Sequence, residues 1–343
     1  MNEATLAAQV LDGKTAGVAR AVSVVENARP GFEELLSTLH PHLGRARRIG
    51  LTGPPGAGKS TLTERLTQAY RAEGLRVAVV AVDPTSPFTG GALLGDRIRM
   101  ESVALDPGVF IRSMATRGSL GGLATATREV CDVLDAAGFD RILVETVGVG
   151  QSELDVTRMA DSSILALVPE SGDGIQALKS GVMEAVDVFV INKSDRPGAP
   201  KLQREVELAL DLRMGKAMRN IPAHHGAIRS GKPAPLPAEE SGWRPPVLLT
   251  VASQGEGVPE LVAGLEQHWQ WLSDSGALQS RRRQRLAERT REVVDRATRR
   301  WVWQESHAEE AIAARLDHIG AGEVSPYELA AEIVAALREG VRV

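Results

Sequence analysis

The chain has 343 residues, 43% of them hydrophobic and 24% charged, and a net charge of −4 at pH 7. This composition is typical of a globular protein with room for an α/β domain and additions, and its mild acidity argues against nucleic acid or an anionic membrane as a partner. No apolar run is long enough to span a membrane, the N-terminal residues do not resemble a signal peptide, and the single cysteine, Cys131, rules out an intrachain disulfide, so we expect a cytoplasmic protein.

The spacing of apolar residues predicts helices first and then an α/β domain. Helices are expected over 5–27 and 31–43, with Pro30 at the start of the second. From 47 to about 272, helical patterns alternate with short runs rich in Val, Ile and Leu, which is typical of parallel strands covered on both faces. The predicted strands are Arg48–Thr52, Val77–Asp83, Val109–Met114, Arg141–Val147, Ser163–Pro169, Val188–Asn192 and Val247–Val251.

From residue 277 onward the pattern is purely helical, and an apolar stripe runs among many arginines. A basic helix of this kind either contacts RNA or a membrane, or is a solvated arm whose stripe packs on a partner; the acidity of the whole chain favours the arm. Ser325 and Pro326 predict the cap and the first residue of a final helix. An extension with too few partners to bury its own stripe indicates a homodimer. The stripe consists of Leu286, Thr290, Val293, Val294, Ala297 and Trp301.

A phosphate-binding loop follows the first predicted strand and opens a helical pattern. Residues 53–61 read Gly-Pro-Pro-Gly-Ala-Gly-Lys-Ser-Thr, which matches G-x-x-x-x-G-K-[ST]. The alternative, a glycine-rich turn without a ligand, is disfavoured by the strand and helix around it. In such a loop Lys59 reaches the β- and γ-phosphates, and the Ser60 hydroxyl is placed to hold Mg²⁺. The expected phosphate contacts are Gly53, Pro55, Gly56, Ala57, Gly58, Lys59, Ser60 and Thr61.

A second motif indicates which base is bound. The strand Val188–Asn192 continues into Asn192-Lys193-Ser194-Asp195, an N-K-x-D sequence. A carboxylate such as Asp195 accepts two parallel hydrogen bonds from N1–H and the exocyclic amine of guanine, a donor pair that adenine lacks. A turn that merely ends the strand is the alternative. Lys193 is expected along the base plane and Asn192 as a tie within the loop, while Val251, Ala252 and Ser253 fit a loop whose backbone N–H contacts guanine O6.

Three acids are expected near the metal, because ligands of open α/β sheets bind beyond the carboxyl ends of the strands. Asp83 ends the second strand, Glu145 lies near the end of the fourth, and Asp96 follows in a glycine-containing segment. Each has a structural alternative as the cap of a turn. With Ser60 they form the expected magnesium ligands, directly or through water. Lys59, Glu145 and Asp96 are the expected catalytic groups.

Three glycine-containing segments flank this site. Residues 84–100 and 148–151 suit switches that become ordered around a γ-phosphate. Residues 172–181 either face the nucleotide or a partner, or simply begin a helix. Between the last two strands, the Pro- and Gly-rich residues 220–246 predict a long loop.

With these motifs, the chain closely resembles the methylmalonyl-CoA mutase-associated GTPases of the MeaB/ArgK type over essentially its whole length. The string Glu145–Glu153, Glu-Thr-Val-Gly-Val-Gly-Gln-Ser-Glu, is its most specific part. The resemblance implies a P-loop GTPase fold with a mostly parallel sheet flanked by helices. It also implies a homodimeric chaperone that binds GTP, GDP and Mg²⁺ and assists cofactor loading, protection or reactivation of an adenosylcobalamin-dependent acyl-CoA mutase. The expected parts are an N-terminal helical extension (1–45), a GTPase domain (46–276) and a C-terminal helical dimerisation arm (277–343).

The chain departs from ordinary GTPases at the metal site, and two other functions compete. Glu145 replaces the usual D-x-x-G aspartate, and Gln151 lies three residues after Gly148, so we name no general base. A nickel metallochaperone GTPase needs a Cys/His cluster, for which the chain offers only His224 and His225 in the long loop. An ATP-dependent kinase linked to basic amino-acid transport would have to tolerate adenine, against which Asp195 argues.

Overall fold

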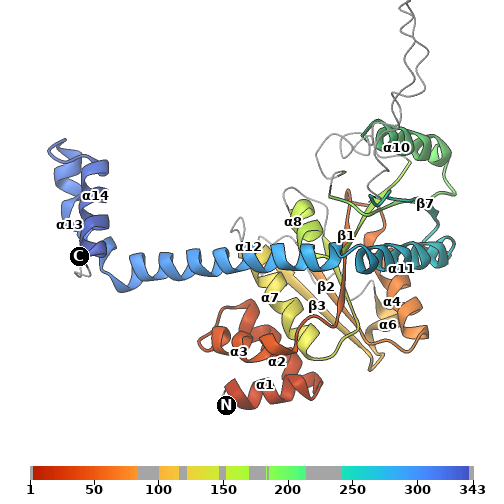
Figure 1. The fold of residues 1–343 in the computed structure, drawn as a ribbon, viewed down its shortest axis with the longest axis horizontal. Helices are drawn as coiled ribbons and strands as arrows, with labels where there is room; N and C mark the ends of the chain where they lie inside the picture. Colours follow the sequence, from red (N-terminus) through yellow and green to blue (C-terminus); the bar gives the residue numbers. More distant parts are fainter. Residues whose placement is uncertain are drawn as a thin grey trace, which may run out of the picture. The chain divides into compact units, whose positions relative to one another are not determined.

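The computed structural model describes residues 3–83, 100–115, 122–146, 152–169, 183, 185–213 and 242–339. Their central feature is a seven-stranded sheet of order β3-β2-β4-β1-β5-β6-β7 in which all neighbours run parallel (Figure 1). All seven predicted strands are present, with ends moved by no more than two residues, and the predicted α/β class is confirmed. The strands are β1 (Arg47–Thr52), β2 (Val77–Asp83), β3 (Val109–Ala115), β4 (Arg141–Thr146), β5 (Ser162–Leu167), β6 (Val188–Asn192) and β7 (Val247–Thr250).

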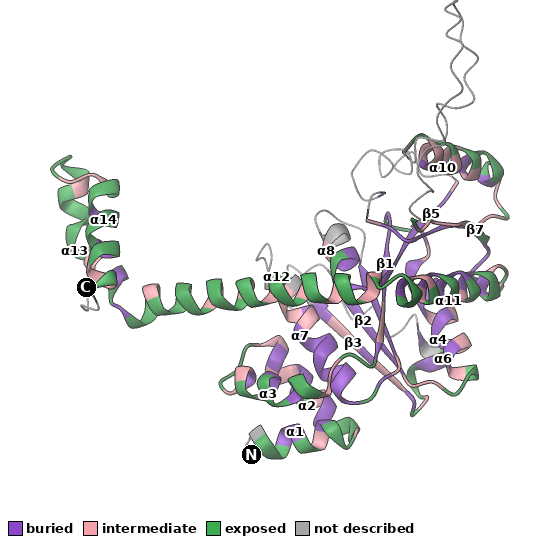
Figure 2. Ribbon diagram, in the orientation of Figure 1, coloured by how far each residue is buried: buried purple, intermediate pink, exposed green. Residues whose placement is uncertain are grey.

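Helices cover both faces of the sheet, so the strands are buried on both sides (Figure 2). Along β2, Val77 and Val79 belong to the core cluster on the face covered by α4 and α11, whereas Ala78 and Val80 join the core under α7 and the N-terminal helices. A third cluster packs α10 against β5 and β6. Alternating residues thus face opposite layers, which explains why the strands read as continuous apolar runs. The covering helices are α4 (Lys59–Ala72), α6 (Glu101–Ala104), α7 (Gly122–Ala136), α8 (Ser152–Met159), α10 (Ala199–Arg213) and α11 (Val258–Asp274).

The N-terminal helices correct two expectations. The stretch predicted as one helix over 5–27 is two, α1 (Glu3–Leu11) and α2 (Thr15–Glu26), because Gly13 takes a positive φ of 66° between them. Pro30 does not begin the next helix: Gly31 caps α3 (Phe32–Leu39) in the left-handed conformation, and a 3₁₀ turn, His40–His42, follows α3. These helices belong to the same core cluster as α7.

The chain divides into two compact units, residues 1–281 and 282–343. Helix α12 (Ala277–Arg300) begins in the first unit, and all of its residues are exposed or half-buried (Figure 2). A π-helical turn (Trp301–Glu305), α13 (Ala308–Gly320) and α14 (Pro326–Arg338) follow. The expected cap is present, since the Ser325 side chain accepts from the Glu328 N–H and the Glu328 carboxylate accepts from the Ser325 N–H.

Cys131 is buried in α7, and burial raises the pKa of its thiol to about 11. Within the described ranges, we find no helix with the length and apolar character needed to cross a membrane.

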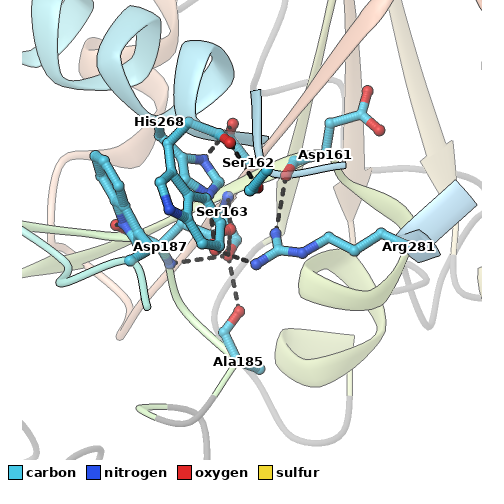
Figure 3. A network of polar contacts seen from close by, with 10 residues as sticks. Asp161, Ser162, Ser163, Ala185, Asp187, His268 and Arg281 are labelled. Atoms are coloured by element: carbon cyan, nitrogen blue, oxygen red, sulfur yellow. Dashed lines mark hydrogen bonds and ion pairs between the residues drawn. The ribbon is translucent and has the colours of Figure 1, made fainter. Parts of the chain in front are cut away.

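A buried polar network lies at the amino ends of β5 and β6, opposite the strand ends where ligands bind (Figure 3). Its centre is Asp187, whose Oδ2 accepts from the backbone N–H and the hydroxyl of Ser163 at 2.9 and 2.8 Å. Its Oδ1 accepts from Arg281 at 2.9 Å and lies 3.2 Å from Nε2 of His268. The other ring nitrogen of His268 lies 2.8 Å from the Ser162 hydroxyl. The network therefore joins two strands to α11 and to Arg281 near the start of α12.

Replacing Asp187 with asparagine should destabilise the protein by about 2–4 kcal/mol, because Arg281 and buried His268 lose the charge that they face. Burial raises the pKa of the Asp187 carboxyl, but His268 and Arg281 outweigh burial and hold this pKa below its usual 3.8. A carboxyl group whose pKa is lower in the folded than in the unfolded state stabilises the fold at pH values above its unfolded pKa. The contribution of Asp187 to stability should therefore disappear as pH falls below about 4. Urea unfolding at pH 7 and pH 3 tests both points.

The control is Asp211→Asn, which removes an exposed ion pair with Arg244 and should cost no more than about 1 kcal/mol. An Asp187→Asn loss as small as that of the control would show that the network contributes little.

Candidate functional site

The loop between β1 and α4 has the backbone geometry of a phosphate cradle. Gly53 and Gly58 take positive φ values of 138° and 85°. A side chain would not fit at either position, because a Cβ would lie 2.1 Å from the Ala166 carbonyl oxygen at Gly53 and 2.3 Å from Nδ2 of Asn192 at Gly58. The loop leads directly into the N-terminus of α4, where the N–H groups of the first turn and the helix dipole favour an anion.

Lys59 holds this loop together from inside. Its side chain is buried, and Nζ donates to the carbonyl oxygens of Gly53 at 2.8 Å and Pro54 at 3.0 Å. A buried ammonium requires such acceptors. The charge of Lys59 therefore lies within the curl of the loop, where a phosphate oxygen can serve as a further acceptor.

Glu145 lies against the start of α4. Its Oε1 accepts from the Ser60 hydroxyl at 2.7 Å and its Oε2 from the Thr63 hydroxyl at 2.9 Å. Glu145 is only 4% exposed. The sheet register explains the approach, since Glu145 on β4 pairs with Leu51 on β1 just before the loop. A carboxylate and a hydroxyl in contact are the hard oxygen donors that suit Mg²⁺. The sequence pattern did not predict Thr63, although Ser60 and Thr63 are three residues apart and so share one face of a helix.

Asp83 ends β2, which pairs with β4 up to Val82 opposite Thr146. Its backbone is thus at the same edge of the sheet as Glu145. The Asp83 side chain and residues Asp96, Gln151, His224 and His225 lie outside the described part of the chain. Most of the segments 84–100, 148–151, 172–181 and 220–246 likewise lie outside the described residues.

Asn192 connects the phosphate loop to the loop after β7. Its Nδ2 donates to the Ala57 carbonyl at 2.8 Å, and its Oδ1 accepts from the Thr250 hydroxyl and the Ala252 N–H, both at 3.1 Å. Next to it, Lys193 takes a positive φ of 57° and donates to the Gly56 carbonyl at 2.8 Å. The N-K-x-D segment, the phosphate loop and the loop at 251–253 therefore meet at one place.

Asp195 is exposed just beyond this junction. The Ser194 N–H donates to the Thr250 carbonyl at 3.0 Å, which fixes the backbone of the segment against the end of β7. Because the Ala252 N–H is already engaged by Asn192, the Ser253 N–H is the next backbone donor of the predicted base loop. Arg65 on α4 also holds this loop, and nothing in the local sequence pattern signals that contact.

A parallel sheet with a lysine-containing phosphate loop after β1, and with an N-K-x-D segment joined to that loop, defines a P-loop GTPase. The family model for methylmalonyl-CoA mutase-associated GTPase MeaB matches residues 18–307, and the chain belongs to this family.

Relatives support both assignments. A Pyrococcus abyssi protein with GTPase in its name is 49% identical over 282 residues, which are 82% of this chain and 81% of the relative. The methylmalonic aciduria type A homolog of Mus musculus, a mitochondrial protein, is 34% identical over 290 residues, or 80% of this chain and 64% of the relative. A crystal structure of an LAO/AO transport system kinase has 28% identity and a TM-score of 0.64, and covers 98% of this chain and 99% of that one.

Proposed function

We propose that this GTPase is a chaperone of an adenosylcobalamin-dependent acyl-CoA mutase, and that it couples GTP hydrolysis to loading, protection or reactivation of the mutase. The observation that carries this proposal is the match to a mutase-associated family over residues 18–307. The mouse relative, whose name refers to methylmalonic aciduria, supports the same client. We expect the protein to act where the mutase does, in the cytoplasm.

In the proposed site the triphosphate lies in the loop 53–61. Backbone N–H groups and the α4 N-terminus bind its oxygens, and Lys59 shares its ammonium between the Gly53 and Pro54 carbonyls and the β- and γ-phosphates. Ser60 and Glu145 would hold Mg²⁺ with Asp83 or Asp96, directly or through water; Mg²⁺ when bound neutralises charge on the β- and γ-phosphates. Asp195 accepts from N1–H and the exocyclic amine of guanine, which selects GTP over ATP.

A second candidate, an ATP-dependent kinase linked to basic amino-acid transport, is favoured only by the name of the solved relative with 28% identity. Nickel delivery is less well supported, because the sequence offers only the pair His224 and His225 and one distant cysteine, Cys131, as ligands for such a metal. A kinase must transfer phosphate to an acceptor other than water. With ATP and a candidate acceptor present, release of inorganic phosphate that accounts for all ATP consumed, or no consumption of ATP, would therefore exclude this alternative.

The client is tested by adding the protein to a cobalamin-free acyl-CoA mutase and following adenosylcobalamin uptake by visible absorbance. We expect a complex of the two proteins, faster GTP turnover in that complex, and uptake that differs between GTP and a non-hydrolysable analogue. Uptake that is identical with and without the GTPase, in the absence of a complex, would contradict the proposed client.

We also propose that the second unit mediates a homodimer. The apolar stripe of α12 and of the π-helical turn after it is exposed, with Leu286, Val294 and Trp301 at 49%, 56% and 43%, which is costly unless a partner covers it. A chain truncated after Arg281 keeps the contacts of Arg281 with Asp187 and should be a monomer that still binds GDP.

Light scattering after size exclusion measures the mass of this truncated chain and of full-length Val294→Glu, which should weaken the dimer without removing the arm. A dimer that persists after truncation would place the interface within residues 1–281.

A further inference from the structure

Arg65 contacts two consecutive carbonyl groups of the loop that follows β7. It lies in the second turn of α4, where its side chain is half-buried. Nε donates to the Ala252 carbonyl at 2.9 Å, and Nη2 donates to the Ser253 carbonyl at 2.6 Å. The remaining nitrogen, Nη1, donates to the Gln68 side chain at 3.1 Å, which steadies the guanidinium on the helix. This fork of donors matches two acceptors that project in the same direction.

Fixing these carbonyls also fixes the N–H groups of the loop. A trans peptide unit is planar, so its N–H points opposite to its C=O. With the Ala252 carbonyl directed at Arg65, the Ser253 N–H must point away from α4. The Ala252 N–H is separately held by Oδ1 of Asn192. The loop at 251–253 therefore has both of these donors oriented before any ligand arrives.

The same contact connects the base loop to the phosphate loop. Arg65 and Lys59 lie on one helix, six residues and about 9 Å of helix axis apart. Asn192 supplies the second connection, through Nδ2 to the Ala57 carbonyl. Two rigid links thus set the distance between the elements that would bind the two ends of a nucleotide, and such pre-organisation strengthens binding.

We propose that Arg65 is a positioning residue for guanine: it holds the Ala252 and Ser253 carbonyls so that the Ser253 N–H can donate to O6 of the base. This inference rests on the proposed guanine site. A purely structural clamp is the alternative: Arg65 would then stabilise the fold, and its loss would weaken binding of all nucleotides alike. The two differ in how affinity depends on the atom at position 6 of the purine.

The test compares GDP, 6-thio-GDP, IDP and ADP by calorimetry on the full chain, with wild type, Arg65→Ala and Arg65→Lys. Sulfur is a weaker acceptor than oxygen, so wild type should bind GDP more tightly than 6-thio-GDP. In Arg65→Ala we expect GDP affinity to fall about three- to tenfold, the value of one hydrogen bond, while 6-thio-GDP loses much less. The ratio of the affinities for GDP and IDP should stay unchanged, because IDP lacks the exocyclic amine that Asp195 would bind. Arg65→Lys keeps the charge but not the fork, and should fall between wild type and Arg65→Ala.

Arg71→Ala is the matched control, because Arg71 also lies on α4 but bonds Asp106 and the Leu75 carbonyl instead of the base loop. It should leave the GDP to 6-thio-GDP ratio at the wild-type value. Parallel losses for GDP and 6-thio-GDP in Arg65→Ala, or no loss for either, would overturn the role of Arg65. Equal affinity of wild type for GDP and ADP is a separate outcome, which would overturn the proposed guanine site and the inference with it.

Discussion

Replacing Lys59 with alanine should reduce the rate of GTP hydrolysis by roughly 10²–10³-fold or more, the usual cost of removing a positioned electrostatic group from a transition state. The structure gives this lysine a second task. Its buried Nζ bonds the Gly53 and Pro54 carbonyls, so alanine leaves two acceptors of the loop without this donor. We therefore expect weaker nucleotide binding as well as slower hydrolysis.

Steady-state phosphate release and GDP titration measure the two effects separately. Lys201→Ala is the control, since Lys201 is exposed on α10 and lies 3.8 Å from Glu205, and it should change neither quantity. Hydrolysis by Lys59→Ala at the wild-type rate would exclude the proposed role of Lys59.

Replacing Asp195 with asparagine should transfer the preference of the site from guanine to xanthine nucleotides. Guanine keeps at most one hydrogen bond, from N1–H to a neutral amide oxygen, and its exocyclic amine then faces the NH2 group of asparagine, so GDP affinity should fall by roughly 10²–10⁴-fold. Xanthine carries a carbonyl at position 2, to which the asparagine amide can donate. Because Asp195 is exposed, the substitution should leave the stability of the fold almost unchanged.

Displacement of a bound fluorescent nucleotide by GDP and by XDP measures this change of preference. Asp211→Asn serves again as the control and should retain the guanine preference. Equal GDP affinities of wild type and Asp195→Asn would remove Asp195 from the base site.

Local patterns were sufficient for the parts of the fold that depend on local physics. Buried parallel strands must be apolar throughout, so β2 and β6 could be bounded from sequence to the residue. Glycines of the phosphate loop take positive φ values that other residues rarely adopt, which is why the loop can be recognised from the sequence. The break between α1 and α2 was missed because apolar spacing continues across Gly13, and only the backbone reversal there ends the helix.

Contacts between distant segments could not be predicted. Thr63 meets Glu145, and Arg65 meets Ala252, only after the sheet has brought together residues more than eighty positions apart. The partners of Asp187 are also scattered, and each alone resembles an ordinary surface or helix residue. Such pairs follow from strand order, which the sequence pattern does not specify.

The Asp187 network and the nucleotide site lie at opposite ends of the strands of the same sheet, so their roles can be separated by experiment. The Asp187 network is at the amino ends of β5 and β6, whereas Lys59, Glu145 and Asn192 gather beyond or near the carboxyl ends of β1, β4 and β6. Asp187→Asn should mainly lower stability, and Asp195→Asn should mainly change base preference. Observing both effects in either variant would mean that the network and the site are coupled through the sheet.

The most direct measurement is a crystal structure with GDP and Mg²⁺ bound. We expect the diphosphate within hydrogen-bonding distance of the backbone of residues 53–61 and of Lys59, and the guanine N1 and exocyclic amine about 2.7–3.2 Å from the Asp195 carboxylate. A diphosphate bound away from this loop, or a base with no contact to Asp195, would contradict the assignment of the site.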